Sequence, residues 1–227
     1  EVSRWMGALG IGDFDVYITR ADGSGDAELL YDHDVMLAEQ YWAPDGELIV
    51  RTGGAGGAVG GRDILALRPG VDTVARPLVA TDLDETGGLV SPLGDWLAYA
   101  LLSDRWEAYV RPFPDTGGPA IKISETGGDV GQWDATGRWL YYIEGADSDA
   151  RMMSAEIRPG SPVEVVRREL FALPNRVAIA GSWTPIDVTK DGRFLMTRYA
   201  DDGQDRQESR LLLVRNFLDN LDRLSAN

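Results

Sequence analysis

The feature that most constrains the fold of this chain is a tight-turn frame that occurs five times along its 227 residues. In each complete copy an apolar residue lies four positions before a turn residue, and a large apolar residue that opens a strand lies two positions after it. The complete copies have their turn glycines at Gly46, Gly94, Gly137 and Gly192. The segment "SRWMGAL" supplies the second half of a fifth copy, with Ser3 in the glycine place. A repeat of this kind has to be identified before single strands are assigned, because it decides the architecture.

The turns at positions 3, 46, 94, 137 and 192 lie 43 to 55 residues apart, and the intervals contain short strand patterns and no helical pattern. Periods in the forties that are built from short strands are typical of β-propeller blades. The segment "SPLGDWLAYALLSDRWEAYVRPFP" at 91–114 is then the central hairpin of one blade. A two-stranded hairpin is marginally stable by itself, and a propeller gives it neighbours. We therefore predict an all-β propeller of about five four-stranded blades over residues 1–215.

The remaining strands of each blade are also visible in the sequence. A third strand ends close to an arginine in "DFDVYITR", "RDILALR", "RWEAYVRP", "ARMMSAEIR" and "SRLLLVRN". A more polar outer strand follows in "AELLYD", "ARPLVAT", "AIKISE" and "VEVVRR", after polar turn segments of the kind that hairpins require.

The two ends of the chain depart from the repeat. In "RNFLDNLDRL" the apolar residues Phe217, Leu218, Leu221 and Leu224 have helical spacing, which predicts a short helix over 216–227 on the propeller surface. The first blade lacks an innermost strand before Ser3, and the last lacks an outermost strand. Because an exposed strand edge invites pairing, we expect either a segment upstream of residue 1 or a second copy of the chain to complete the sheet. Of these, the upstream segment is favoured over a homodimer joined through open blade edges.

Charge and composition exclude several classes of partner. The formal net charge is −15, from 22 basic and 37 acidic residues, so the surface repels nucleic acid and anionic lipid. Cysteine is absent, which excludes disulfides and thiolate zinc sites. We expect no nucleic-acid partner.

The turn motifs resemble those of a known family. The segment "YWAPDGELIV" contains Trp42, Pro44, Asp45 and Gly46, and "SPLGDWLAYA" contains a similar Ser-Pro-x-Gly turn. These repeats resemble TolB-like, WD-repeat-like β-propellers, whose turn is Trp-Ser-Pro-Asp-Gly. The sequences at 109–118 ("YVRPFPDTGG") and 214–224 ("VRNFLDNLDRL") resemble the C-terminal propeller of bacterial serine/threonine kinases. The chain departs from the pattern at Leu93, which replaces the Asp, and at "DATG" (134–137).

The resemblance implies a non-catalytic sensor or scaffold module of a larger bacterial signalling protein. It implies a protein or small-ligand partner at the propeller mouth, an upstream kinase or membrane segment, and an extracytoplasmic rather than cytoplasmic location. None of these implications follows from the repeat itself.

Residues and motifs that commonly act in catalysis are few in this sequence. His33 is the only histidine and lies between two aspartates in a polar loop, and no Gly-x-Ser-x-Gly segment is present. The glycine-rich stretch 53–61 lacks the Lys-Ser/Thr ending of a phosphate-binding loop, and the acidic loops lack the spacing of a calcium loop. We predict no catalytic residue, no metal site and no cofactor, and hence no enzyme. The alternatives are an accessory propeller of a peptidase or lyase and a structural unit that dimerises.

The seven tryptophans suggest both core and surface roles. Trp5, Trp96 and Trp139 lie two positions after the turn, where inter-blade packing is expected. Trp42 and Trp133 lie on innermost strands and suit either packing or display at the channel mouth.

Trp106 and Trp183 lie in loop-like contexts. Aromatic residues at a concave surface are typical anchors for partners. The candidate binding residues belong to the innermost strands and the loops that enter them, namely Tyr41, Asp129, Gln132, Trp183 and Asp187.

Overall fold

The computed structural model describes residues 2–8, 14–53, 61–173, 177, 186–189 and 191–197. Within these residues the regular structure consists of β-strands and one short 3₁₀ turn, η1 (Asp147–Asp149). No helix in this part of the chain has the length and apolar character needed to cross a membrane. The predicted helix at 216–227 and the predicted strand at 209–215 lie outside the described residues.

The strands form successive antiparallel sheets, which we call blades 1 to 5. Blade 1 contains β1 (Val2–Ala8), β2 (Phe14–Arg20) and β3 (Glu28–Tyr31). Blade 2 contains β4 (Leu37–Trp42), β5 (Leu48–Thr52), β6 (Ile64–Leu67) and β7 (Arg76–Val79). Blade 3 contains β8 (Asp84–Val90), β9 (Trp96–Leu102), β10 (Trp106–Pro112) and β11 (Ile121–Lys122). Blade 4 contains β12 (Gly128–Trp133), β13 (Trp139–Glu144), β14 (Arg151–Arg158) and β15 (Glu164–Ala172), and blade 5 contains β16 (Ile186–Val188) and β17 (Phe194–Met196).

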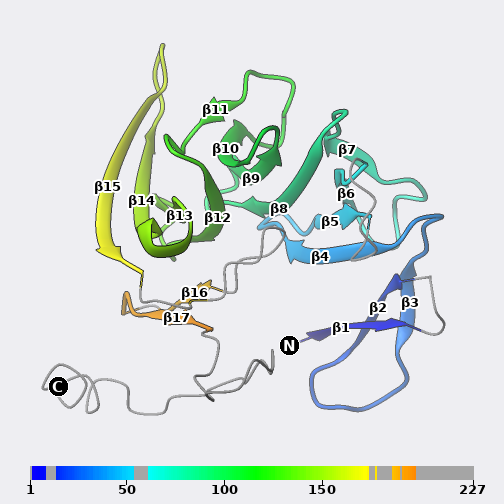
Figure 1. Ribbon diagram of the computed structural model, residues 1–227. Coiled ribbons are helices and arrows are strands. Elements are labelled where there is room, and N and C mark those ends of the chain that lie inside the picture. Colours follow the sequence, from blue (N-terminus) through cyan, green and yellow to red (C-terminus); the bar gives the residue numbers. More distant parts are fainter. Residues whose placement is uncertain are drawn as a thin grey trace, which may run out of the picture.

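The blades follow one another around an arc (Figure 1). Strand order within each sheet is the order along the chain, so β4, β8, β12 and β16 are the first strands of their blades. Contacts join β4 to β8, β8 to β12 and β12 to β16. These first strands therefore form the inner wall, and the later strands of each blade lie farther out, as the repeat predicts for a propeller.

The predicted turns have a common hydrogen bond. The backbone N–H groups of Gly46, Gly94, Gly137 and Gly192 each donate to the carbonyl three residues earlier, with N···O distances of 3.0, 2.8, 3.0 and 2.9 Å. All four glycines have φ between +72° and +88°, a region that side chains disfavour. In blade 1 the frame differs, because Ser3 pairs with Thr19 inside β1 instead of occupying a turn.

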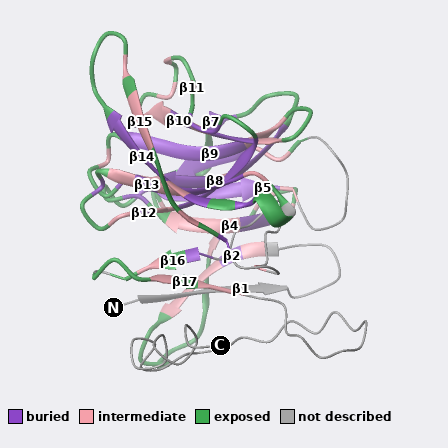
Figure 2. Cartoon of the chain, turned by 60° about the vertical axis from the view of Figure 1, so that its left-hand side comes forward, coloured by how far each residue is buried: buried purple, intermediate pink, exposed green. Residues whose placement is uncertain are grey.

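The core lies between neighbouring sheets. One cluster joins blades 3 and 4 and includes Trp96, Trp133 and Tyr142, and another joins blades 2 and 3 through residues such as Ile49 and Tyr99. Burial is concentrated in β5, β8 and β9, whereas β15 is partly exposed (Figure 2). Adjacent blades therefore stabilise one another through apolar contact.

The tryptophans divide between core and surface. Trp96 and Trp133 are buried, and the Trp133 indole Nε1 donates to the Leu89 carbonyl of blade 3 at 3.0 Å. Trp42, at the end of β4, is 38% exposed. The prediction that Trp139 is core was wrong: it is half-buried, because its ring packs against the arginine side chains of 138 and 168 instead of filling the space between two sheets.

Candidate functional site

Three of the predicted binding residues occupy equivalent places. Tyr41, Gln132 and Asp187 are each the last residue but one of an inner strand, in β4, β12 and β16. Gln132 and Asp187 thus lie on neighbouring strands, near the ends that lead into the first turns. The Gln132 Oε1 accepts from the Trp133 N–H at 3.0 Å, and the Asp187 Oδ1 accepts from the Val188 N–H at 2.8 Å.

Tyr41 is half-buried and packs against the apolar clusters on both sides of blade 3. Trp183 lies outside the described residues. Contact between any of these residues and a ligand stays a prediction.

Asp129 lies at the opposite end of its strand. It is the second residue of β12, is only 6% exposed, and lines a pocket between blades 3 and 4. The structure therefore places Asp129 at the other end of the inner strands from Tyr41, Gln132 and Asp187.

The pocket opens beside the loops that enter β10 and β12. Its volume is about 250 Å³. Blade 3 contributes the β9–β10 loop and the first residue of β10. The β11–β12 loop, the first residues of β12, the end of β13 and the start of the β13–β14 connection form the rest of the lining. The lining residues are Arg105, Trp106, Thr126, Gly127, Gly128, Asp129, Ile143, Gly145 and Ala146.

Glycines make room for this pocket. The Gly145 N–H donates to the Gly127 carbonyl at 3.2 Å, which ties the two glycine-containing loops together. Gly127 has φ +97°, and a Cβ at Gly128 would lie 2.7 Å from the Ile143 carbonyl oxygen. Side chains at these positions would therefore strain the backbone or close the space between the loops.

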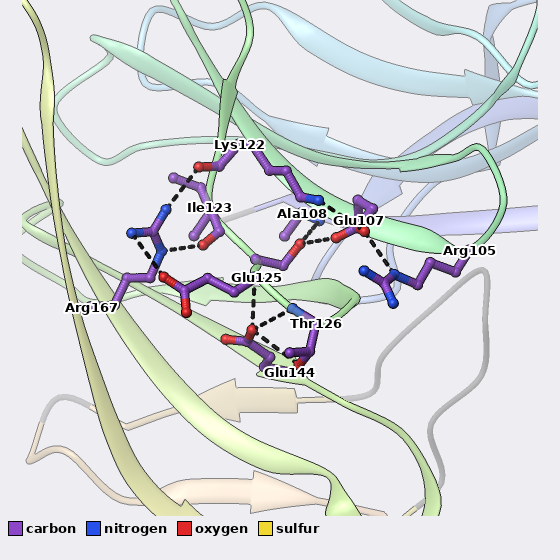
Figure 3. A network of polar contacts seen from close by, with 10 residues as sticks. Arg105, Glu107, Ala108, Lys122, Ile123, Glu125, Thr126, Glu144 and Arg167 are labelled. Carbon is purple, nitrogen blue, oxygen red and sulfur yellow. Dashed lines mark hydrogen bonds and ion pairs between the residues drawn. The ribbon is translucent and has the colours of Figure 1, made fainter.

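Buried Glu107 forms the first half of a polar network beside the pocket (Figure 3). Its Oε1 lies 2.8 Å from Arg105 Nε and 2.9 Å from Lys122 Nζ. Its Oε2 accepts from the Ser124 hydroxyl at 2.5 Å, and Ser124 Oγ in turn accepts from the Ala108 N–H. Burial alone would raise the pKa of Glu107, but these three donors outweigh it and hold the pKa below its usual value.

Glu144 and Arg167 hold the loop between β11 and β12 from the blade 4 side (Figure 3). Glu144 Oε1 accepts from the backbone N–H groups of Glu125 and Thr126 at 2.7 and 2.8 Å. Arg167 donates to the carbonyls of Ile123 and Lys122 at 2.5 and 3.2 Å. The loop wall is thus fixed by side chains from β10, β13 and β15.

The single histidine of the chain makes contacts within its own segment. His33 Nδ1 accepts from the Val35 N–H at 3.2 Å, and the imidazole ring packs 6.0 Å from that of Tyr31, so its contacts are structural. In the described ranges, no group of three or more histidine or carboxylate side chains is arranged to hold a metal ion. The residues that line the pocket include one aromatic residue (Trp106), one basic residue (Arg105) and one acidic residue (Asp129), and the others are small, apolar or hydroxyl residues.

Sequence reasoning found only part of this pocket. It named Asp129 and singled out Trp106, but it missed Arg105 and the loop residues at 126–128. The available signal was the glycine pair at Gly127 and Gly128, where β12 begins, because the corresponding connection from blade 2 to blade 3 at 80–83 contains no glycine.

Comparison with known proteins found matches among solved structures only. No family model matches the sequence, and no curated protein matches it. Among solved structures, TolB from Acinetobacter baumannii superposes with a TM-score of 0.59 at 11% identity, over 89% of this chain and 48% of that one. A putative TolB from Agrobacterium tumefaciens gives 0.54 at 13% identity, over 82% of this chain and 76% of that one.

A prolyl endopeptidase structure gives a TM-score of 0.51 at 15% identity, over 87% of this chain and 29% of that chain. The chain thus spans about half of the Acinetobacter protein and a smaller share of the endopeptidase. Likeness at these identities concerns the fold, and the resemblance to kinase-associated propellers stays a prediction. The sheets, the turns and these superpositions together show that the chain has a TolB-like β-propeller fold.

Proposed function

We propose that this chain is a non-catalytic binding module that presents the pocket between blades 3 and 4 to a protein or small ligand. The observation that carries the proposal is the fixed wall of that pocket. Glu107, Glu144 and Arg167 hold the β11–β12 loop through hydrogen bonds that need no ligand. A wall that is already ordered reduces the entropy lost on binding.

The size of the pocket limits what it accepts. Its volume of about 250 Å³ lies below the roughly 300–1,000 Å³ of typical small-molecule sites. One amino-acid side chain or a small ligand group fits this space better than a drug-sized molecule. The half-buried Trp106 supplies the aromatic surface that partner side chains commonly contact.

The wider setting that we propose is a larger bacterial signalling protein, with an upstream kinase or membrane segment and an extracytoplasmic propeller. The support is the sequence likeness at 109–118 and 214–224 to kinase-associated propellers. A second setting, an accessory propeller of a peptidase, is favoured by the endopeptidase superposition. The domain encoded next to this segment distinguishes the two, since a kinase supports the first and a hydrolase supports the second.

The binding proposal is tested with protein labelled with 5-fluorotryptophan and titrated with capped single amino acids of all side-chain types. The Trp106 signal is assigned from the Trp106→Phe variant. At least one probe should shift that signal saturably in ¹⁹F NMR. Absence of any shift at millimolar concentration would contradict the proposal.

Two variants provide the matched comparison. Ala146 lies at the exposed rim of the pocket, so Ala146→Trp should fill the space and abolish the shift. Ser148 is exposed in the neighbouring η1 turn and does not line the pocket, so Ser148→Trp should leave the shift unchanged.

A further inference from the structure

A second pocket lies on the face of blade 4 that packs against blade 5. Its volume is about 430 Å³, which is within the roughly 300–1,000 Å³ of typical small-molecule sites. Strands β13, β14 and β15 form one side, and blade 5 contributes a turn glycine and a phenylalanine of β17. The lining residues are Trp139, Tyr141, Ser154, Arg168, Leu170, Phe171, Gly192 and Phe194.

Strand pairing brings the polar groups of this second pocket together. Tyr141, Ser154 and Arg168 are partners across β13, β14 and β15, so their side chains project from the same face of the sheet. Trp139 precedes Tyr141 by two positions and therefore lies on that face as well. The Arg168 guanidinium carbon is 5.9 Å from the centroid of the Trp139 ring. One surface thus presents a guanidinium group, an indole ring and two hydroxyl groups.

Aromatic rings form the apolar part of the second pocket. Phe194 of β17 contacts Tyr141 and Phe171 edge to face, with ring centroids 4.9 and 5.5 Å apart. Leu170 remains 37% exposed at this site. These side chains offer an apolar group of a ligand a surface to pack against.

The polar groups in the second pocket are mainly hydrogen-bond donors. In the part of the chain that the structure describes, no carboxylate pairs with the Arg168 guanidinium, which lies against the Trp139 ring. Burial and the charge of Asp134 raise the pKa of Tyr141, and no hydrogen bond to its hydroxyl contributes. The buried Ser154 Oγ is 3.5 Å from the Arg168 carbonyl oxygen, which is long for a hydroxyl hydrogen bond. Because the lining residues include no carboxylate or amide side chain, the pocket favours a ligand that supplies an acceptor.

Nearby negative charge does not remove this preference. Asp134 does not line the second pocket, and it already accepts from the N–H groups of Trp139 and Thr136 at 2.8 and 3.1 Å. The formal charge of −15 opposes an anion at long range, so affinity has to come from short-range contact with Arg168. A guanidinium group can donate two parallel hydrogen bonds to one carboxylate, and such pairs are among the stronger hydrogen bonds in proteins.

We infer that the second pocket binds an organic carboxylate with an apolar body about the size of a phenyl ring. The carboxylate accepts from Arg168, and the body packs between Trp139 and Phe194. A free carboxylic acid and the C-terminal carboxylate of a peptide chain share this chemistry. The inference concerns a different pocket from that of the proposed function and goes beyond it.

The test uses protein labelled with 5-fluorotryptophan, in which the Trp139 signal is assigned from the Trp139→Phe variant. The probes are 3-phenylpropanoate, 3-phenylpropanamide and 3-phenylpropylammonium, which carry the same ring and differ in the charge of the end group. The carboxylate should bind about tenfold more tightly than the amide, which corresponds to about 1.4 kcal/mol. The ammonium compound should give no shift of the Trp139 signal.

Arg168→Gln should reduce binding of 3-phenylpropanoate about tenfold and change the affinity of the amide much less. Retained binding of the amide shows that the pocket is intact in this variant. The control is Arg151→Gln, which removes an exposed arginine of the adjacent strand β14 that does not line the pocket. It should change neither affinity. An equal loss for both probes, or the same loss in both variants, overturns the role of Arg168 and with it the inference.

Two further probes distinguish the sources of the carboxylate. N-acetylphenylalanine has the free carboxylate of a chain terminus, and its amide lacks it. If N-acetylphenylalanine binds more tightly than 3-phenylpropanoate, the inference holds with a peptide C-terminus as ligand. The reverse order supports the inference with a free acid as ligand.

The remaining outcomes contradict the inference. Equal affinity of 3-phenylpropanoate and 3-phenylpropanamide, or tighter binding of the ammonium compound, overturns it. Absence of any shift of the Trp139 signal at millimolar probe concentration also overturns it. The proposed function is judged from the Trp106 signal, so the labelled protein distinguishes its failure from the failure of this inference.

Discussion

Glu85 shows how one residue in this propeller can oppose stability at neutral pH. It is fully buried in β8, and its Oε1 accepts from the Thr81 hydroxyl at 2.5 Å. Its Oε2 has no hydrogen-bond partner among the described residues. Burial, with smaller contributions from the charges of Asp63 and Asp84, raises the pKa of Glu85 from 4.5 to about 7. The folded protein therefore retains a proton that the unfolded chain has lost at pH 6.

This difference predicts a pH-dependent loss of stability. Below pH 4.5 Glu85 is protonated in both the folded and the unfolded state. Between pH 4.5 and pH 7 the unfolded chain binds fewer protons than the folded protein, so the free energy of unfolding falls as pH rises. The fall attributable to Glu85 is about 3 kcal/mol. Glu85→Gln, which is neutral at every pH, should remove most of it.

Urea unfolding of both proteins at pH 5 and pH 8 measures the effect. The variant should gain stability relative to wild type mainly at pH 8. An equal difference between the two proteins at both pH values would show that the Glu85 carboxyl does not titrate in this range.

At the scale of the element, β8 depends on glycine to pack between its neighbours. A Cβ at Gly87 would lie 2.7 Å from Val130 Cγ2 of β12, and one at Gly88 would lie 3.0 Å from the Cγ2 atoms of Ile49 and Ile64. Blades 2 and 4 thus approach blade 3 at positions that have no side chain.

We expect Gly87→Ala to destabilise the protein by about 2–4 kcal/mol, because it adds a clash to the cost of φ +89°. Gly94→Ala is the matched control: its φ is +72° and nothing lies within 4 Å of the added Cβ, so it should cost about 1–2 kcal/mol. Thermal or urea unfolding measures both.

The double variant Gly87→Ala, Val130→Ala identifies the cause. Removing the Val130 methyl groups relieves the contact, so the two substitutions should be less harmful together than the sum of their single effects. If the two losses of stability simply add, the cost of Gly87→Ala comes from the backbone conformation at Gly87 and not from contact with Val130.

The arginines that end the third strands show what the repeat predicts and what it leaves open. Their recurrence is visible in the sequence, and the structure confirms their places in β6, β10 and β14 or directly after them. Their partners differ: Arg158 pairs with Glu156 of its own strand at 2.7 Å, whereas Arg111 donates to the Tyr99 hydroxyl at 3.0 Å. The Arg111 partner could not be predicted, because Tyr99 lies on a neighbouring strand that the fold brings alongside, whereas Glu156 is two residues from Arg158 on the same strand.

For the whole molecule, the dominant electrostatic feature is the net charge of −15. Many of its ion pairs connect residues of the same blade and involve exposed arginines, as in Arg20–Asp22 and Arg151–Glu169, and such pairs contribute little. Salt weakens both the attraction within these ion pairs and the repulsion among the excess carboxylates. Because the pairs contribute little, the weakened repulsion should be the larger effect.

We accordingly expect moderate salt to stabilise the protein. Raising NaCl from about 0.01 M to about 0.15 M shortens the Debye length from about 30 Å to about 8 Å. A gain of about 1 kcal/mol would raise Tm by about 2–4 °C for a chain of this size. Differential scanning calorimetry at fixed pH tests the direction, and a lower Tm in salt would mean that local ion pairs dominate.

The sequence by itself determined the blades, because turn hydrogen bonds and strand alternation are local properties that need only a few neighbouring residues. It could not determine the pocket, which requires two blades to meet. The tetrapeptide "ETGG" occurs at 85–88 and at 125–128. In the first copy Glu85 and Thr86 are buried in a strand, and in the second Glu125 and Thr126 are exposed in the loop at the pocket. Only the tertiary structure decides between these roles, because the strands and side chains that pack against each copy come from distant parts of the chain.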